Sequence, residues 1–217
     1  MLNNDVVLEP ASLRHLVEAS EGRPGAIYGA TLLYQDDPST IQAAGGAVYL
    51  PPIGRSRHFG KRRNCEDLIV PPKFDYIIVA SLFFSKDVIE EIGILPEAFH
   101  LYFEETEFCA RGKSRGIALV WVPEARLVHK EGRSTGAGSG FRSLSDLSFR
   151  FIVRNSMLFT EMRHPAWLMT VLLFNMFECV RHCCFGDFGK ARVLVEALNE
   201  YWARRGEFAR EASALGD

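Results

Sequence analysis

Long apolar runs separated by short polar stretches fill the first 130 residues of the chain. Residues 26–34 and 76–84 are almost continuously apolar, as expected of strands that are covered on both faces. Residues 10–19 and 86–92 instead carry apolar side chains at helical spacing, and a glycine follows closely after each segment. This alternation predicts an α/β fold with a mixed or parallel sheet that is flanked by helices.

Shorter elements complete the prediction for this part of the chain. Residues 41–50 are predicted to form a pair of short strands around two glycines, whereas 51–72 is polar, basic and rich in Gly and Pro, which indicates a surface loop. Residues 117–122 and 127–129 are predicted to form two further strands. A Gly/Ser-rich loop is expected at 132–140.

The pattern turns helical from residue 144 onward. Residues 145–162 and 191–211 are amphipathic, while 165–186 is strongly apolar but interrupted by charges. We therefore expect two parts, an α/β domain at 1–143 and a helical extension at 144–217. The segment 165–186 is too short and too charged to cross a bilayer, which takes about 20 apolar residues. It is predicted to be either an interfacial helix, with peripheral membrane contact, or a buried core helix.

Composition narrows the class of protein. Hydrophobic residues make up 47% and charged residues 24%, which is an ordinary balance for a globular protein. The net charge of −2 predicts no broad attraction to nucleic acid. The number of cysteines is odd, and the sequence carries neither zinc-site spacings nor a signal-peptide pattern. Reduced thiols in a cytoplasmic protein are expected.

Asp5 is the first candidate for chemistry. It closes the polar tip Asn3-Asn4-Asp5, which looks like the end of a buried strand. A hard cation such as Mg²⁺ or Mn²⁺ prefers oxygen ligands and usually shares them with substrate phosphates. The alternative is that Asp5 caps a turn or the helix that follows, and residue type alone favours this simpler interpretation.

The acidic segment Glu104-Glu105-Thr106-Glu107 is the second candidate. Neighbouring carboxylates raise one another's pKa, which suits a general base that works near neutral pH. The alternative is an acidic helix amino terminus that the helix dipole favours. The aromatic residues at 100–103 shift the balance towards function, because solvated caps seldom need such surroundings.

His129 is the third candidate, since it ends an apolar strand and a basic loop follows it. A histidine in this place can bind a metal ion or contact a diphosphate, and a satisfied core histidine is an equal alternative. Asp5, Glu104-Glu105 and His129 all follow apolar runs or the loops that leave them. Ligands of α/β sheets bind where such strand ends meet, so we expect these side chains to converge on one edge of the sheet.

Several motifs in order resemble family-2 glycosyltransferases, most closely the rhamnosyltransferase-like branch. Asn3 and Asp5 stand at the two positions of the Asp-x-Asp motif, and 75–84 is similar to the acceptor-side strand. The segment Tyr102-Phe103-Glu104-Glu105-Thr106-Glu107-Phe108-Cys109-Ala110-Arg111 resembles the catalytic acidic motif. The Pro/His segment that ends at His129 and the pair Arg154-Asn155 follow in the family's order.

The resemblance implies a partial GT-A fold and an inverting transfer of a sugar, with rhamnose favoured, from a nucleotide-sugar donor to a hydroxyl group of a glycan or lipid-linked acceptor. Such transfer serves cell-wall or polysaccharide biosynthesis. By position, Asp5 and His129 would bind a divalent cation, Mg²⁺ or Mn²⁺, with Asn3 as a weaker ligand. Glu105 would be the catalytic base. The residues implied to contact the substrate are Glu104, Arg111 and Ser81.

Three departures from the family pattern matter. Asn3 replaces an aspartate, and Glu105 is one methylene longer than the usual aspartate base. The third departure is the lack of the family's first strands and helices, which hold the nucleotide. We therefore expect an amino-terminally truncated chain whose isolated form has little activity. The competing hypotheses are a non-catalytic remnant and a cytoplasmic interaction module that docks on the inner face of the membrane through 165–186.

Overall fold

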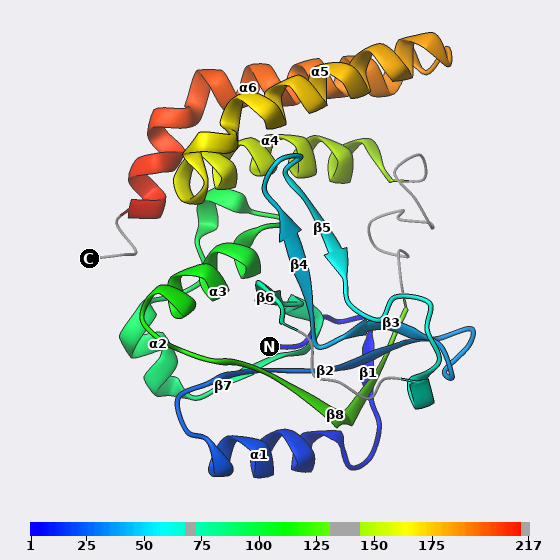
Figure 1. Ribbon diagram of the computed structural model, residues 1–217, viewed down its shortest axis with the longest axis vertical. Helices are drawn as coiled ribbons and strands as arrows, with labels where there is room; N and C mark the ends of the chain where they lie inside the picture. Colours follow the sequence, from blue (N-terminus) through cyan, green and yellow to red (C-terminus); the bar gives the residue numbers. More distant parts are fainter. Residues whose placement is uncertain (68–72, 131–143, 214–217) are drawn as a thin grey trace. The chain divides into compact units, whose positions relative to one another are not determined.

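The computed structural model describes residues 1–67, 73–130 and 144–213 (Figure 1). The predicted loop at 132–140 lies outside these residues. The elements are, in chain order, β1 (Val6–Leu8), α1 (Ser12–Gly22), β2 (Ile27–Tyr34), β3 (Ile41–Ala44), β4 (Gly46–Leu50), β5 (Arg55–His58), β6 (Tyr76–Ile77), β7 (Leu82–Phe84), α2 (Lys86–Ile92), α3 (Glu104–Ser114), β8 (Leu119–His129), α4 (Asp146–Arg163), α5 (Leu168–Cys184) and α6 (Phe188–Ser213).

A mixed five-stranded sheet forms the centre of the α/β part. Its strand order is β1-β8-β2-β3, and β7 also pairs with β2. Strand β2 runs parallel to β8 and antiparallel to β3 and β7. The α/β prediction with a mixed sheet, flanking helices and a helical extension is therefore confirmed, and the arrangement is consistent with a partial GT-A-like fold.

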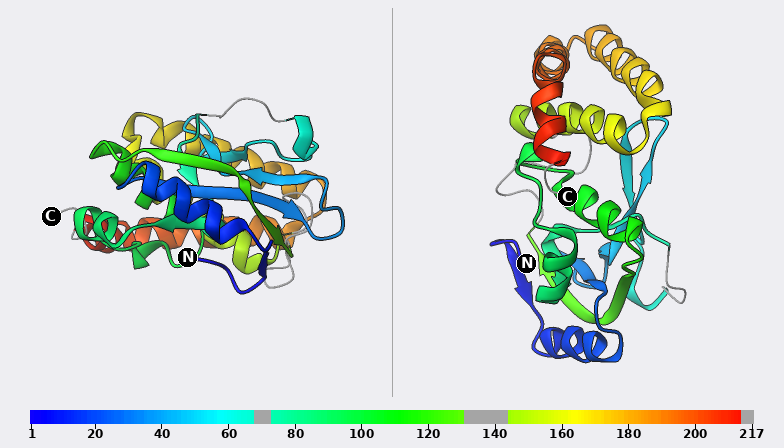
Figure 2. Two further views of the ribbon diagram at one scale, coloured as in Figure 1. Left: turned by 90° about the horizontal axis from the view of Figure 1, so that it is seen from below. Right: turned by 90° about the vertical axis from the view of Figure 1, so that its left-hand side faces the viewer.

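The central position of β2 follows from its sequence. Seven of its eight residues are buried, and Ile27, Tyr28 and Leu32 are at most 1% exposed. Helix α1 packs on β8 beside this sheet, and Leu16 is its buried apolar contribution (Figure 2). On α3, Phe108 joins the same core. A continuously apolar strand needs cover on both faces, and these helices supply part of it.

A second, three-stranded sheet has the order β5-β4-β6. Gly45 separates β3 from β4, and its φ of +76° is one that an L side chain rarely adopts. The chain is also crowded here, because a Cβ on Gly29 would lie 2.7 Å from the Gly45 carbonyl oxygen. These two glycines therefore allow the two sheets to approach each other closely.

The prediction of a single strand at 76–84 is wrong. A 3₁₀ turn at Val79–Ser81 divides the run, so that β6 pairs with β4 and β7 pairs with β2. The run is apolar throughout because both sheets bury it, and hydropathy carries no signal for the turn. Strand β5 likewise occupies part of the surface loop expected at 51–72.

The two strands expected at 117–122 and 127–129 are one strand, β8. Its register with β2 shifts between Ala30 and Thr31, which pair with Val122 and Arg126. The residues in between form a bulge that contains Pro123, whose carbonyl oxygen accepts a hydrogen bond from Thr31 Oγ1 at 3.2 Å. Proline has no N–H to donate to a ladder, so a bulge accommodates it inside a strand.

The described residues divide into two compact units. The first contains Met1–Tyr49, Ser56–Leu95 and Glu105–Glu131, and thus most of both sheets with α1 and α2. The second contains α4, α5 and α6, which pack on one another, together with the segments Leu50–Arg55 and Pro96–Glu104. A single boundary at residue 143 does not describe these two segments.

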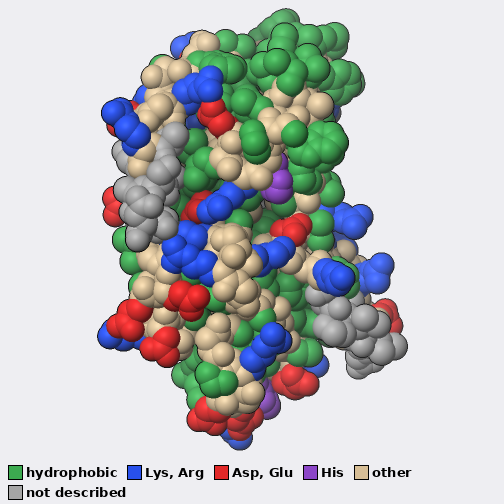
Figure 3. All heavy atoms as spheres, turned by 60° about the vertical axis from the view of Figure 1, so that its left-hand side comes forward, with side chains coloured by type: hydrophobic (Ala, Val, Ile, Leu, Met, Phe, Trp, Pro, Cys, Tyr) green, Lys and Arg blue, Asp and Glu red, His purple; other side chains and the backbone are tan. Residues whose placement is uncertain are grey.

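Helix α5 buries its polar side and exposes its apolar side. Its buried residues are Val171, Asn175, Glu178 and His182. The exposed stripe consists of Met169, Leu173, Met176, Phe177 and Val180, each between 52% and 64% exposed. Figure 3 shows hydrophobic side chains gathered over α5. Within the described ranges, no helix is long and apolar enough to cross a membrane.

Candidate functional site

Asp5 and His129 meet at the edge of the five-stranded sheet. Val6 of β1 pairs with His129 of β8, and the Lys130 amide donates to the Asp5 carbonyl oxygen at 3.0 Å. This register places His129 Nε2 3.3 Å from Asp5 Oδ1, with both side chains less than one-fifth exposed. The structure thus brings together a carboxylate and an imidazole from opposite ends of the first unit's sequence.

The expectation that Asp5 ends a buried strand is wrong. Asp5 lies in a turn that precedes β1 and does not follow a buried strand. Strand β1 is an edge strand, antiparallel to β8, and Val7 on it is 54% exposed. The antiparallel pairing is what aligns the start of β1 with the end of β8. Asn3 is exposed, and its carbonyl oxygen accepts from the Val6 amide at 3.3 Å.

Gln42 of β3 orients the histidine. Its Oε1 lies 2.6 Å from His129 Nδ1. An amide oxygen can only accept, so His129 carries its proton on Nδ1 and, when neutral, presents the Nε2 lone pair to Asp5 Oδ1. Two lone pairs at this distance repel each other. Either protonation of Nε2 or a cation shared by the two atoms relieves that repulsion.

The residues fit a divalent cation of the kind that the sequence implies. The described residues contain no group of three or more His, Cys, Asp or Glu side chains that could hold a metal ion. Mg²⁺ and Mn²⁺, however, commonly take one or two protein ligands and share the rest with water and phosphates. Adjacent octahedral ligands at about 2.1 Å lie about 3 Å apart, close to the 3.3 Å between Asp5 Oδ1 and His129 Nε2. Metal-binding histidines commonly donate their other ring N–H to a fixed acceptor, as His129 Nδ1 does to Gln42 Oε1.

His58 of β5 lies beside this pair, and no sequence pattern predicts it. Burial, reinforced by the electrostatic influence of Lys61 and His129, lowers the pKa of His58 to about 4, although a hydrogen bond to the Gln42 backbone opposes the shift. His58 is therefore neutral at physiological pH. It lies in the basic segment expected to be a surface loop. That segment has no periodic pattern of hydrophobic residues from which the burial of His58 could be predicted.

Glu105 lies at the start of α3 and is 8% exposed. Burial and then the nearby Glu105 carboxylate raise the pKa of Tyr76. The structure thus places Glu105 beside Tyr76 of β6. That Glu105 reaches the same substrate as Asp5 and His129 stays a prediction.

Glu104, the first residue of α3, has its own electrostatic character. Burial raises the pKa of its carboxyl group, and a backbone hydrogen bond opposes the shift only in part. One of its oxygens, Oε2, is buried without a hydrogen-bond partner among the described residues. A carboxyl group with a raised pKa can accept a proton close to neutral pH.

Two other residues expected at the substrate hold the fold. The Arg111 guanidinium pairs with Glu107 at 3.1 Å and donates to the carbonyl oxygens of Ile92 and Ile94, where α2 ends. Ser81 is 2% exposed, and its Oγ accepts from the Ala30 amide at 3.3 Å. Their contact with substrate stays a prediction.

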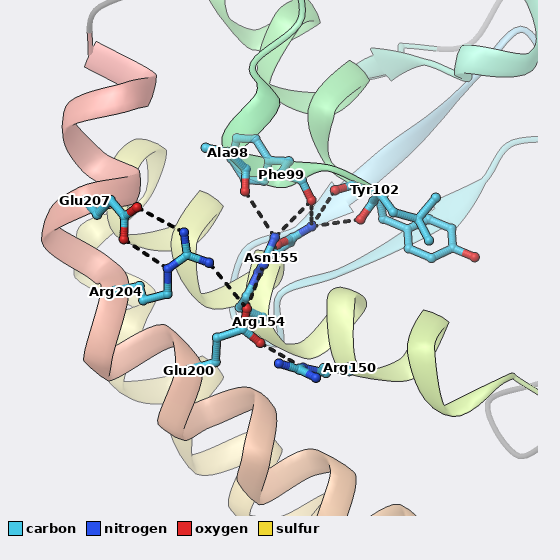
Figure 4. A network of polar contacts seen from close by, with 10 residues as sticks. Ala98, Phe99, Tyr102, Arg150, Arg154, Asn155, Glu200, Arg204 and Glu207 are labelled. Carbon is cyan, nitrogen blue, oxygen red and sulfur yellow. Dashed lines mark hydrogen bonds and ion pairs between the residues drawn. The ribbon is translucent and has the colours of Figure 1, made fainter.

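The segment 98–103 in front of α3, here called the lead-in segment, has an unusual backbone. His100, Tyr102 and Phe103 have positive φ angles of 59°, 66° and 75°. Each such residue costs of order 1–3 kcal/mol unless its surroundings enforce the conformation. Arg154 and Asn155 of α4, which belong to the same compact unit as the lead-in segment, enforce this conformation (Figure 4).

Asn155 is fully buried, and its Nδ2 lies within 2.7–2.8 Å of the carbonyl oxygens of Phe99, Leu101 and Tyr102. Arg154 Nη2 donates to the carbonyl oxygens of Ala98 and Phe99, both at 3.0 Å. Arg154 Nε also donates to Asn155 Oδ1 at 2.8 Å. The two neighbouring side chains therefore supply hydrogen bonds to four backbone carbonyl groups of the irregular lead-in segment.

The proteins to which this chain is similar in sequence are glycosyltransferases. It is 30% identical over 123 residues to the low-salt glycan biosynthesis hexosyltransferase Agl10 of Haloferax volcanii, which covers 56% of the chain and 38% of that protein. It is 26% identical over 103 residues to the dTDP-rhamnosyl transferase RfbF of Shigella flexneri, which covers 46% of the chain and 35% of that protein. No family model matches the chain. The matches thus span little more than a third of each relative.

Proposed function

We propose that this chain forms the acceptor-side part of an inverting glycosyltransferase that depends on a divalent cation. It would transfer a sugar from a nucleotide-sugar donor to a hydroxyl group of a glycan or a lipid-linked acceptor. The approach of His129 to Asp5, with Gln42 behind it, carries this proposal. The similarity to a protein named as a rhamnosyl transferase favours rhamnose as the donor sugar.

Each residue has a defined task in the proposed reaction. The acceptor oxygen attacks the anomeric carbon from the side opposite the leaving group, the bond to the diphosphate breaks, and Glu105 takes the acceptor proton. Asp5 and His129 would hold Mg²⁺ or Mn²⁺, and Gln42 orients the His129 ring through Nδ1. The cation, when bound, neutralises the charge on the leaving diphosphate.

Cation binding tests the Asp5–His129 pair directly. Mn²⁺ titrated into the chain with dTDP present should bind, and Asp5→Asn or His129→Ala should weaken that binding at least about tenfold, since the first removes the negative charge of one ligand and the second removes the other ligand. His15→Ala is the matched control, because His15 lies on α1, where its Nδ1 is 3.7 Å from Glu18 Oε2. Mn²⁺ binding that survives both substitutions unchanged contradicts the proposed site.

Transfer from dTDP-rhamnose and other nucleotide sugars, measured with Mn²⁺ and with EDTA, tests the reaction. Glu105→Gln should lower kcat by about 10²–10⁴-fold, the usual contribution of a general base. Glu104→Gln serves as the comparison, because Glu104 is the adjacent carboxyl group with the raised pKa. A kcat that falls for Glu104→Gln and not for Glu105→Gln moves the base to Glu104.

We propose in addition that α5 docks on the surface of an anionic membrane. Five large apolar side chains on it are more than half exposed, and its polar residues point inward. Glu178, the single acidic residue in 165–186, is 9% exposed and paired with Arg181 at 2.5 Å. The exposed face thus carries no uncompensated negative charge, and Arg163 ends α4 a few residues before α5 begins. An apolar helix face with this charge balance fits a helix lying in the plane of the interface.

Co-sedimentation with vesicles of mixed anionic and neutral phospholipid tests this docking. The chain should bind them more strongly than purely neutral vesicles. Leu173→Ser with Phe177→Ser should lower binding at least about tenfold, since two buried apolar side chains are worth more than 1.4 kcal/mol. The matched control is Leu13→Ser with Val17→Ser on α1, which are 55% and 39% exposed. A dimer in solution that the α5 substitutions dissociate means that a second copy covers this face.

A further inference from the structure

Arg154 and Asn155 show an unusual concentration of polar contacts for two adjacent residues of one helix. Both are at most 3% exposed, and together they contact four backbone carbonyl oxygens of the lead-in segment. The last of these carbonyl groups, that of Tyr102, lies two residues before Glu104. The contacts therefore determine where α3 begins and hence how its first carboxylates are presented.

Further contacts fix the Arg154 side chain itself. Its Nη1 donates to Glu200 Oε1 of α6 at 2.9 Å. Its guanidinium lies over the rings of Phe151 and Phe208, with 4.7 and 4.8 Å to their centroids. Burial opposes the ionisation of Glu200, yet its pairs with Arg154 and Arg150 hold its pKa below the usual range. The charge of Arg154 is thus balanced by a carboxylate that remains ionised.

The geometry also explains why these two residue types are needed. A guanidinium is a planar fork that can serve two carbonyl oxygens, the Asn155 side chain and Glu200 at once, which an ammonium group cannot do. The Asn155 carboxamide oxygen accepts a hydrogen bond from Arg154, and its NH₂ group donates to the carbonyl groups of the lead-in segment. A carboxylate in its place would have no hydrogen to donate.

We propose that Arg154 and Asn155 are positioning residues for the acidic motif. They hold the lead-in segment in its left-handed backbone conformation and so direct Glu104 and Glu105 towards the reacting groups. This inference rests on the proposed function for its kinetic consequence. Its structural consequence, a held lead-in segment, is independent of any activity.

Hydrogen exchange measures the structural consequence. The amides of His100 and Leu101 donate to the carbonyl oxygens of Glu97 and Phe99 at 2.9 and 2.6 Å. In Asn155→Ala these two amides should exchange at least about tenfold faster, because local opening of a released segment is more frequent. Asn175→Ala is the matched control, as Asn175 is equally buried on α5 and bonds to Arg55 instead. It should leave exchange at His100 and Leu101 unchanged.

Kinetics measure the catalytic consequence. Asn155→Ala should lower kcat by roughly 100-fold with the donor KM nearly unchanged, because a carboxylate misplaced by about 1 Å has this effect. Arg154→Lys, which keeps the charge opposite Glu200, is the second variant if Asn155→Ala does not fold, and it should show the same split. Asn175→Ala, compared at equal distance from its own melting temperature, should keep its kcat.

The outcomes separate the two proposals. Faster exchange in a chain that neither binds Mn²⁺ with dTDP nor transfers sugar leaves the holding role intact and contradicts the proposed function. Normal transfer by the parent chain, with kcat of both variants within threefold of it, overturns the positioning role. Unchanged exchange at His100 and Leu101 in Asn155→Ala overturns it as well.

Discussion

Burial decides which single residues depart from their ordinary chemistry. His58 and Glu104 are both titratable groups placed where water is largely excluded, and each shifts towards its neutral form. In His58 burial lowers the pKa, whereas in Glu104 it raises the pKa. The two groups thus have opposite effects on stability as the pH changes.

His58 predicts a loss of stability in mild acid. Because its pKa is about 4 in the folded chain and about 6.5 when unfolded, it favours folding above pH 6.5, and this contribution is lost as the pH falls towards 4. The loss is of order 3 kcal/mol at most. In the His58→Gln variant, the free energy of unfolding should lack this contribution and fall less between pH 6.5 and pH 4. Urea unfolding at pH 7.0 and 4.5 measures the difference, and an equal loss in parent and variant contradicts it.

The site residues show what one sequence can and cannot reveal. Asp5 and His129 stand in a recognisable order of motifs, so their approach could be expected. Gln42 and His58 come from β3 and β5, and no local pattern marks them. They join the pair only through strand register and burial, which a sequence does not display directly.

At the scale of elements, the ends of helices follow local rules while the breaks in strands do not. Helix α2 spans Lys86–Ile92, as the spacing predicts, with Gly93 after it at a φ of +76°. The turn at Val79–Ser81 and the bulge at Pro123 depend instead on which strand each half pairs with. Such partners are distant in sequence, so periodicity cannot locate these breaks.

Two serines at helix starts give a matched prediction. The Ser145 side chain accepts from the Ser148 amide at 3.1 Å and caps α4, whereas Ser85 stands in the same place on α2 without a side-chain cap bond. Ser145→Ala should therefore lower the free energy of unfolding by about 1 kcal/mol, and Ser85→Ala by less than about half of that. Chemical denaturation of both variants decides, and equal losses would remove the distinction between the two caps.

At the scale of the whole molecule, chain order and compact units do not coincide. The second unit takes in Leu50–Arg55 and Pro96–Glu104 from the first part of the sequence. Arg55 bonds there to Ser156 and Asn175, at 3.2 and 2.8 Å. A change of composition at residue 144 marks the helices but not these segments, because six and nine residues carry too little pattern.

A fragment of residues 144–217 should consequently fail to fold as a stable bundle. It lacks the carbonyl acceptors of Arg154 and Asn155 and the Arg55 partner of Asn175. Each buried polar group left unsatisfied costs about 1–3 kcal/mol. Circular dichroism during urea unfolding should show a broad, weakly cooperative transition. A sharp transition like that of the full chain would establish 144–217 as an independent domain.

The hydrogen bonds between α4 and the lead-in segment hold a strained backbone in place. Three residues sit in conformations that they would leave if released, and two side chains on one helical turn keep them there. Loss of these hydrogen bonds would allow the positive-φ residues before α3 to relax to more favourable conformations. The backbone in front of Glu104 therefore depends on the position of α4.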